Sequence, residues 1–174
     1  MRLSAPLARG MADEGTPYRG ILYVGLMLTG DGPQVIEFNC RLGDPEAQVI
    51  LPRLRSDLVA AMLATVEGTL GHVSLRWDNR SAVTVVMAAE GYPGAYEKGS
   101  VISGTEGAEA SDDVMLFHAG TKIDDAGTVT AHGGRVLAVT GLGDDAGTAR
   151  AAAYAAVDSI DWPGGFCRRD IAAG

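Results

Sequence analysis

Glu37, Asn39 and Arg41 occupy alternate positions in the stretch "VIEFNCRLGDPEAQ" (35–48). Successive side chains of a β-strand point to opposite faces, so these three would share one face if the strand continues, with Phe38 on the other. A carboxylate and an amide oxygen suit Mg²⁺, which commonly takes one or two protein ligands together with phosphate oxygens and water. A guanidinium beside them can hold a phosphate or a developing oxyanion. The spacing is therefore typical of a metal-and-phosphate site.

Two simpler interpretations remain open from the spacing alone. Glu37 and Arg41 could form a salt bridge at the end of a sheet, where acidic and basic residues are common. The "GDPE" that follows (43–46) has the pattern of a helix start, with Asp44 as the N-cap and Pro45 in the first helical position. Capping alone would explain that segment without a catalytic role.

The hydrophobic pattern predicts the elements that carry these residues. Residues 20–29 and 34–39 are rich in β-branched and large apolar residues, and a Gly-Asp-Gly-Pro turn signal between them predicts a hairpin. Residues 56–68 predict a helix with Ser56 as its N-cap and Gly68 just after its C-terminus. The apolar spacing in this helix predicts a buried stripe. Its expected members are Leu58, Ala61, Met62, Thr65 and Val66.

The rest of the chain predicts a second domain. From about residue 73 the pattern changes to short strands between Gly, Asp and Pro turns, followed by an Ala-rich helix at roughly 145–160. We place a domain boundary after residue 78, giving domains 1–78 and 79–174. Apolar residues four apart also predict a short N-terminal helix, and these are Leu3, Leu7 and Met11. The predicted fold class is α/β (α+β), with antiparallel strands and helices followed by a small β-rich domain carrying one helix.

Composition and charge exclude several classes of function. The 174 residues carry a net charge of −8, which argues against a nucleic-acid partner because phosphate neutralisation needs clustered Lys and Arg. Cys40 and Cys167 lack metal-ligand spacing, and the three histidines are too dispersed in the sequence to predict a metal cluster. The N-terminus lacks the continuous apolar core of a signal peptide, and no apolar run is long enough for a membrane span. We therefore expect a cytoplasmic protein without a membrane partner.

Residues 18–68 closely resemble glycinamide ribonucleotide synthetase, also called phosphoribosylamine–glycine ligase, an ATP-grasp family of purine biosynthesis. The most specific match is "RLGDPEAQ" (41–48). Further matches follow in the order of the family's C-terminal domain, and they are "GYPGAYEKG" (91–99), "FHAGT" (117–121), "GGRVLAVTGLG" (133–143) and "RRDI" (168–171). The resemblance therefore extends over essentially the whole chain.

The resemblance implies roles for four residues. Glu37 and Asn39 would ligate Mg²⁺ or Mn²⁺ bridging the ATP phosphates. Arg41 would be the catalytic residue that neutralises charge around the transferred phosphoryl group, and Asp44 would help shape the substrate and phosphate site. In the implied reaction, ATP phosphorylates the glycine carboxylate. The amine of 5-phosphoribosylamine then attacks the acyl phosphate, giving 5-phosphoribosylglycinamide, ADP and phosphate.

The resemblance also implies that part of the enzyme is not in this sequence. The lid over the phosphates, the ATP-binding lysines and the adenine-binding segment precede the matched region in the family. We therefore expect activity only with a separate N-terminal half, weak binding of Mg²⁺–ATP by the chain alone, and an exposed apolar face. Two non-enzymatic alternatives remain: a stand-alone remnant, and a module in residues 81–174 that serves packing or oligomer contact.

Overall fold

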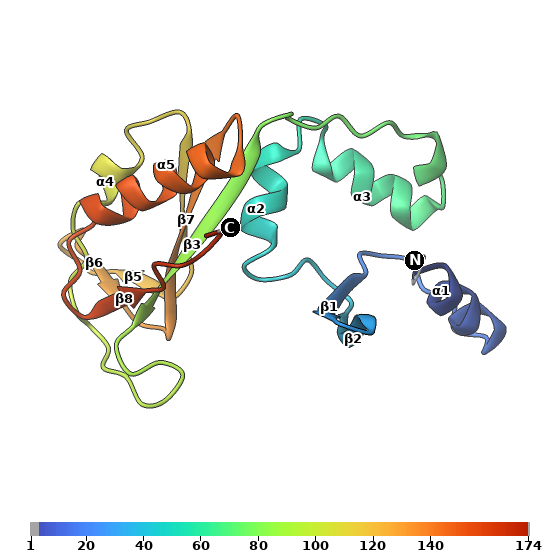
Figure 1. Cartoon of the computed structure of the whole chain (residues 1–174), viewed down its shortest axis with the longest axis horizontal. Helices are drawn as coiled ribbons and strands as arrows, with labels where there is room; N and C mark the ends of the chain where they lie inside the picture. The colour runs from blue at the N-terminus through green and yellow to red at the C-terminus, as the bar shows by residue number, and fades with distance from the viewer. Residues whose placement is uncertain (1–3, 174) are drawn as a thin grey trace. The chain divides into compact units, whose positions relative to one another are not determined.

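The structure is a computed structural model that describes residues 4–173. The chain forms two compact units, each described here by itself. Unit 1 comprises Met1–Glu46 and Leu54–Trp77, and unit 2 comprises Ala47–Arg53 and Asp78–Gly174. Helices are mixed with antiparallel strands in both, as the order of elements in Figure 1 shows, so the predicted fold class is confirmed. The boundary after residue 78 stays a prediction.

Unit 1 contains the hairpin that the sequence predicts. Its strands pair antiparallel, and the remaining elements are helices; the bounds are α1 (Ser4–Asp13), β1 (Tyr23–Thr29), β2 (Gly32–Asn39), α3 (Leu58–Glu67) and the 3₁₀ turn η2 (Leu70–His72). The expected N-terminal helix is present as α1, with Leu7 and Met11 half-buried. Leu3, the other residue of its predicted apolar face, lies outside the described residues.

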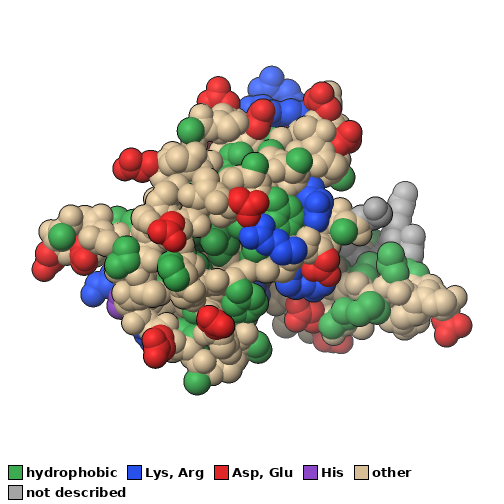
Figure 2. Space-filling model, turned by 60° about the vertical axis from the view of Figure 1, so that its left-hand side comes forward, with side chains coloured by type: hydrophobic (Ala, Val, Ile, Leu, Met, Phe, Trp, Pro, Cys, Tyr) green, Lys and Arg blue, Asp and Glu red, His purple; other side chains and the backbone are tan. Residues whose placement is uncertain are grey.

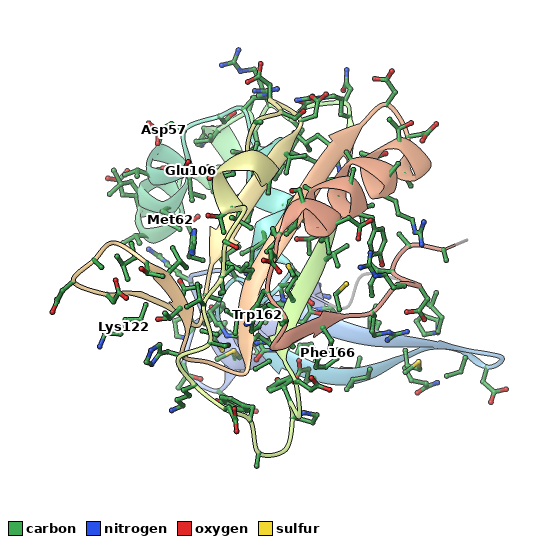
Figure 3. All side chains as sticks on the ribbon, turned by 90° about the vertical axis from the view of Figure 1, so that its left-hand side faces the viewer. Asp57, Met62, Glu106, Lys122, Trp162 and Phe166 are labelled. Carbon is green, nitrogen blue, oxygen red and sulfur yellow. The ribbon has the colours of Figure 1, made fainter. Side chains whose placement is uncertain are left out.

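The N-cap of α3 is Asp57, so the prediction of Ser56 is wrong (Figure 3). The Asp57 carboxylate accepts a hydrogen bond from the Ala60 N–H at 3.1 Å, which satisfies one of the unpaired donors of the first turn. The Ser56 hydroxyl instead accepts from the Arg76 N–H at 2.7 Å. Gly68 ends the helix in the left-handed conformation, with φ 74°.

The predicted stripe of α3 is buried only in part. Ala61 is buried, as is Ala64, whereas Met62 is 41% and Val66 68% exposed. The cause is that large apolar side chains occur on more than one face of this helix, and unit 1 covers only the face with the small alanines. The prediction is therefore wrong for Met62 and Val66. Large apolar residues of the hairpin are exposed as well: Leu26, Met27, Leu28, Val35, Ile36 and Phe38.

Unit 2 is built on a four-stranded antiparallel sheet in the order β4-β7-β3-β8, with a separate pair β5-β6. The strands are β3 (Ser81–Ala89), β4 (Val114–His118), β5 (Thr121–Ile123), β6 (Val129–Ala131), β7 (Arg135–Gly143) and β8 (Gly165–Cys167). The helices are α2 (Ala47–Ile50), the 3₁₀ turn η1 (Leu51–Arg53), α4 (Thr105–Ala108) and α5 (Ala146–Ser159). The expected Ala-rich helix is thus α5.

Two glycines of β7 allow α5 to pack directly on the strand backbone. A Cβ at Gly141 would lie 2.3 Å from the Ala149 carbonyl oxygen, and a Cβ at Gly143 would lie 2.5 Å from the Ala149 nitrogen. No side chain fits at either position without moving the helix. The glycines of the "TGLG" segment are therefore explained by close helix–strand contact.

The opposite face of β7 holds α2 through a buried hydroxyl. Thr140 is fully buried, and its hydroxyl donates to the Gln48 carbonyl at 2.8 Å. The Thr84 hydroxyl lies 2.7 Å from that of Thr140. Because Thr140 has a single hydroxyl hydrogen, Thr84 must donate to Thr140. Side chains alternate along the strand, so α5 and α2 cover opposite faces of this sheet (Figure 1).

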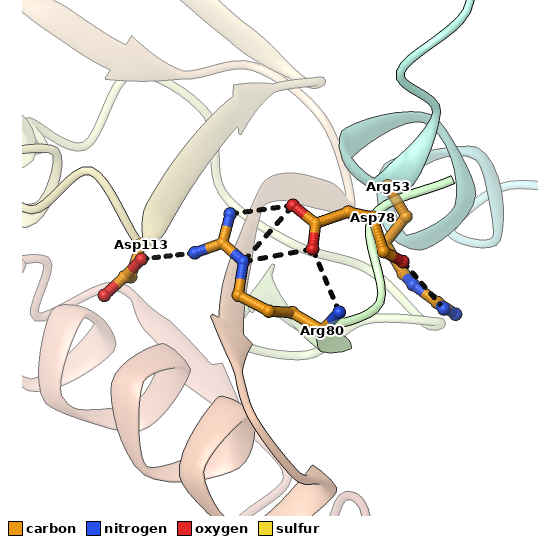
Figure 4. A network of polar contacts seen from close by, with 4 residues as sticks. All are labelled: Arg53, Asp78, Arg80 and Asp113. Atoms are coloured by element: carbon orange, nitrogen blue, oxygen red, sulfur yellow. Dashed lines mark hydrogen bonds and ion pairs between the residues drawn. The ribbon is translucent and has the colours of Figure 1, made fainter. Parts of the chain in front are cut away.

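Charged residues tie the end of η1 to the start of β3 (Figure 4). The Arg53 guanidinium donates to the Asp78 carbonyl at 3.2 Å, and the Asp78 N–H donates to the Arg53 carbonyl at 2.7 Å. Arg80 bridges the Asp78 and Asp113 carboxylates at 3.0 and 2.6 Å. The hydrogen bond from Asp78 is the main reason that the pKa of Arg80 is raised. The segment 47–53 is therefore anchored to unit 2 at both ends.

Unit 2 has a buried hydrophobic core. The largest fully buried apolar side chains come from its two long strands, and they are Val85, Val136, Leu137, Val139 and Leu142.

On the face shown in Figure 2, acidic side chains are spread widely and basic ones occur in separate groups. Among residues 4–173, no helix is both long and apolar enough to cross a membrane.

We expect Thr140→Val to destabilise unit 2 by about 1–3 kcal/mol, because it leaves the Gln48 carbonyl and the Thr84 hydroxyl without their buried partner. Urea unfolding followed by circular dichroism measures the change. Thr140→Ser is the matched control, since it keeps the hydroxyl. A Val variant as stable as the unchanged chain would show that the hydroxyl does not hold α2.

The N-cap of α5 predicts a pH dependence of stability. The Thr148 N–H donates to the Asp145 carboxylate at 2.7 Å, and this bond lowers the pKa of Asp145. Because the folded pKa lies below the unfolded one, the stabilisation is complete above the unfolded pKa and is lost as pH falls through the folded pKa. We expect Asp145→Asn, which can still cap, to lose less thermal stability than the unchanged chain between about pH 6 and pH 3. Thermal melts test this, with exposed Asp125→Asn as control, and parallel curves for Asp145→Asn and the unchanged chain would contradict it.

Candidate active site on the hairpin of unit 1

The register of the hairpin places Glu37 and Asn39 on one face. Glu37 pairs with Gly25 and Asn39 pairs with Tyr23 across the two strands. The register shifts between Gly25 and Leu26, so that Ile36 is an extra residue on β2 immediately before Glu37. Such β-bulges re-aim neighbouring side chains and are frequent beside active sites.

Gly25 provides the space that Glu37 occupies. A Cβ at Gly25 would lie 3.1 Å from Cγ of Glu37, which is tighter than most real contacts of this kind. A larger residue at this position would therefore displace the Glu37 carboxylate. Gly25 is buried within β1, and a glycine in a strand interior is the signal in the sequence that marks such a close approach.

Three of the four predicted site residues form a hydrogen-bonded chain. The Asn39 amide donates to the Glu37 carboxylate at 2.9 Å, and the Arg41 guanidinium donates to the Asn39 amide oxygen at 3.4 Å. Arg41 also donates to the Leu42 carbonyl at 2.9 Å. In the described part of the chain, Glu37 and Arg41 form no ion pair with one another, so the direct salt bridge is not the arrangement adopted.

The capping interpretation predicted that the "GDPE" segment begins a helix at Pro45, and this prediction is wrong. Residues 44–46 form a turn, and α2 begins only at Ala47. In this turn the Asp44–Pro45 peptide is cis, and the Glu46 side chain bonds back to the hairpin. Asp44, the fourth predicted site residue, is exposed in this turn, three residues beyond Arg41.

Glu46 and Tyr23 are parts of the site that the sequence analysis did not identify. The Tyr23 hydroxyl donates to the Glu46 carboxylate at 3.1 Å. A Cβ at Gly43 would lie 2.1 Å from the other Glu46 oxygen, so a side chain at that position would displace the Glu46 carboxylate. The hydrogen bond to Glu46 is the main reason that the pKa of Tyr23 is raised, and the charge of Glu37 adds to it. The only signal in the sequence was Glu46 itself, as the last residue of "GDPE".

The donor set of this face fits a metal ion that takes most of its ligands from elsewhere. Glu37 and Asn39 lie close enough to hydrogen-bond, so one ion could contact an oxygen of each. Across residues 4–173, no group of three or more His, Cys, Asp or Glu side chains is placed to hold an ion. Two protein oxygens with water and phosphate oxygens are the usual coordination of Mg²⁺ on a nucleotide.

Two parts of the chain match models of known protein domains. Residues 2–47 match the ATP-grasp (A) domain of phosphoribosylglycinamide synthetase, and residues 82–174 match its C domain. The chain therefore belongs to the phosphoribosylglycinamide synthetase family, as its sequence motifs predict.

Individual relatives agree with this assignment. The chain is 57% identical over 166 residues to phosphoribosylamine–glycine ligase of Mesorhizobium japonicum and 54% identical over 169 residues to that of Brucella melitensis. These alignments cover 95% and 97% of the chain but 39% of each relative. The crystal structure of phosphoribosylamine–glycine ligase from Thermotoga maritima matches with a TM-score of 0.77 at 39% identity, covering 94% of this chain and 39% of that one.

We expect Glu46→Gln to lower the pKa of Tyr23 toward that of an ordinary tyrosine, because it removes the negative charge that holds the phenol protonated. Ultraviolet titration of the phenolate measures this shift, and Tyr23→Phe identifies which part of the titration belongs to Tyr23. An unchanged Tyr23 titration in Glu46→Gln would show that the two side chains do not interact in solution.

Proposed function

We propose that the chain is the C-terminal portion of a phosphoribosylamine–glycine ligase and that it works with an N-terminal portion supplied by further polypeptide. The observation that carries the proposal is the hydrogen-bonded chain of Glu37 and Asn39, on one face of the hairpin, and Arg41, just beyond the end of β2, in a member of this family. The substrates would be ATP, glycine and 5-phosphoribosylamine. A cytoplasmic location remains a prediction.

The proposed reaction has two steps. An oxygen of the glycine carboxylate attacks the γ-phosphorus of ATP, and ADP leaves. The nitrogen of 5-phosphoribosylamine then attacks the carbonyl carbon of glycyl phosphate, inorganic phosphate leaves, and the nitrogen loses a proton. Both steps concentrate negative charge on phosphoryl and acyl oxygens, so donors fixed in advance at those oxygens lower the barriers.

Arg41 is the residue of this chain that is suited to stabilise the negative charge on those oxygens. Its hydrogen bonds to the Leu42 carbonyl and the Asn39 amide fix the guanidinium beside Glu37 and leave other N–H donors for an oxyanion. A planar guanidinium can bind two oxygens of one phosphoryl group at once. Asp44, exposed in the following turn, would border the substrate.

Glu37 and Asn39 would hold Mg²⁺ or Mn²⁺. A bound ion of this kind supplies neutralisation of the ATP phosphates. The Asn39 amide nitrogen donates to Glu37 in the structure, so this hydrogen bond must break before the amide can offer its oxygen to an ion. The ion therefore competes with a hydrogen bond between its own two ligands.

The test is reconstitution from two polypeptides. The chain is mixed with the segment of the Mesorhizobium japonicum relative that precedes the aligned part, and ADP release is measured with and without glycine and 5-phosphoribosylamine. ADP release that depends on both substrates supports the proposal. A folded mixture that releases no ADP would instead favour the non-catalytic interpretations.

Within the reconstituted enzyme, we expect Glu37→Gln to lower kcat by at least about 100-fold, because a direct metal ligand matters more than the outer-shell groups whose loss costs 10–100-fold. Asp31→Asn is the matched control, since it removes one carboxylate from the turn of the same hairpin. Full turnover by Glu37→Gln would refute the metal assignment even if the reconstitution succeeds.

A further inference from the structure

Unit 1 contains a cavity of about 600 Å³ beside Arg41 that the proposed metal face does not use. It lies between the segment before β1, the residues that follow β2, and one side of α3. The side chains that matter for its chemistry are Tyr18, Arg19, Cys40, Arg41, Met62 and Val66. Its volume is within the range of pockets that enclose a small organic ligand, and far larger than glycine needs.

The positive charge of the cavity lining favours a negatively charged ligand. Arg19 and Arg41 are the charged residues of the cavity wall, and its lining contains no carboxylate. This composition contrasts with the net charge of −8 for the whole chain. Two guanidinium groups in a lining without a carboxylate attract a ligand that carries negative charge.

Both guanidinium groups are held in position, yet most of their donors remain available. Arg19 donates to the Val66 carbonyl near the C-terminal end of α3 at 2.9 Å. Arg41 donates to the Leu42 carbonyl and to Asn39. A guanidinium has five N–H donors, so each arginine can still bind an oxyanion. Because the contacts to main-chain carbonyls fix these side chains, a ligand would not need to order them.

The remainder of the wall is apolar and suits the carbon face of a sugar. Met62 and Val66, which the sequence predicted as buried, instead line this cavity with Leu42. On the opposite side, the Tyr18 hydroxyl donates to the Ile21 carbonyl at 2.8 Å, which fixes the ring in the wall. The cavity therefore fits a compact molecule with an anionic group at one end, which the arginines would bind, and a largely uncharged body against the apolar wall.

We propose that this cavity binds the phosphate monoester of a sugar phosphate, with Arg19 as the main phosphate ligand. Given the proposed function, on which the identity of the ligand rests, the sugar phosphate is the amine substrate. Arg41 would then lie between the phosphate of this substrate and the phosphoryl group that reacts at Glu37 and Asn39. Arg19 would set specificity for the acceptor without contacting ATP.

The probe is ribose 5-phosphate, and it is titrated into this chain without further polypeptide. Two-dimensional NMR follows the amide signals during the titration. We expect saturable binding, and we expect Arg19→Met to raise Kd about tenfold, as for the loss of one charged hydrogen bond. Arg9→Met, on exposed helix α1, is the matched control and should not change Kd. Val66→Glu is a second variant that leaves Arg19 in place. It puts a carboxylate into the lining at a position exposed enough to tolerate it, and should also weaken binding.

Several results would overturn the proposal. These are no saturable binding, binding that neither Arg19→Met nor Val66→Glu weakens, and equal affinity for inorganic phosphate, which would mean that the cavity recognises only charge. Tighter binding of glycine than of ribose 5-phosphate would also contradict it.

The reconstituted enzyme separates this inference from the proposed function. There, Arg19→Met should raise KM for 5-phosphoribosylamine about tenfold and leave KM for ATP unchanged. Activity with an unaltered KM for 5-phosphoribosylamine would refute the cavity assignment alone. Ribose 5-phosphate binding by the chain without any ligase activity would refute the proposed function alone.

Discussion

The register of the β1–β2 hairpin is the constraint on which the site depends. Side chains alternate along a strand, so a slip of one residue would move Glu37 and Asn39 to the opposite face. Three features oppose such a slip: the extra residue Ile36, the space that Gly25 leaves for Glu37, and the bond from Tyr23 to Glu46. Residues that look ordinary in the sequence, Gly25 and Tyr23, therefore position the residues that look chemical.

The same site shows how the two proposed metal ligands can lie near an arginine without an ion pair. Asn39 lies between Glu37 and Arg41 and hydrogen-bonds to both, so the acid and the base are linked without pairing directly. A direct ion pair would have to be broken before a metal could bind, and separating two paired charges costs more than breaking a hydrogen bond in which only the acceptor is charged.

The sequence predicted those features of the fold and site that depend on local periodicity. Alternation in the strand placed Glu37 and Asn39 on one face, and the apolar runs gave the hairpin and α3. Prediction from the sequence failed where a residue distant in the chain determines the local structure. Ser56 and Asp57 are both good caps, and the choice depends on Arg76, twenty positions away, which engages the Ser56 hydroxyl. The bond from Tyr23 to Glu46 is likewise one that no local pattern reveals, since the two residues lie 23 positions apart.

The two units differ in how completely they are packed, and this difference affects binding. Unit 2 has a closed core around Val85 and Leu137, whereas in unit 1 Leu28 is 82% and Ile36 62% exposed. An isolated two-stranded hairpin is marginally stable in water, so unit 1 gains from any polypeptide that covers those side chains. A ligand at Glu37 or Arg19 selects the same folded hairpin. By linkage, each binding event must then strengthen the other, because both reduce the population in which the hairpin is open. An N-terminal portion would thus raise affinity for metal and sugar phosphate even without touching either one.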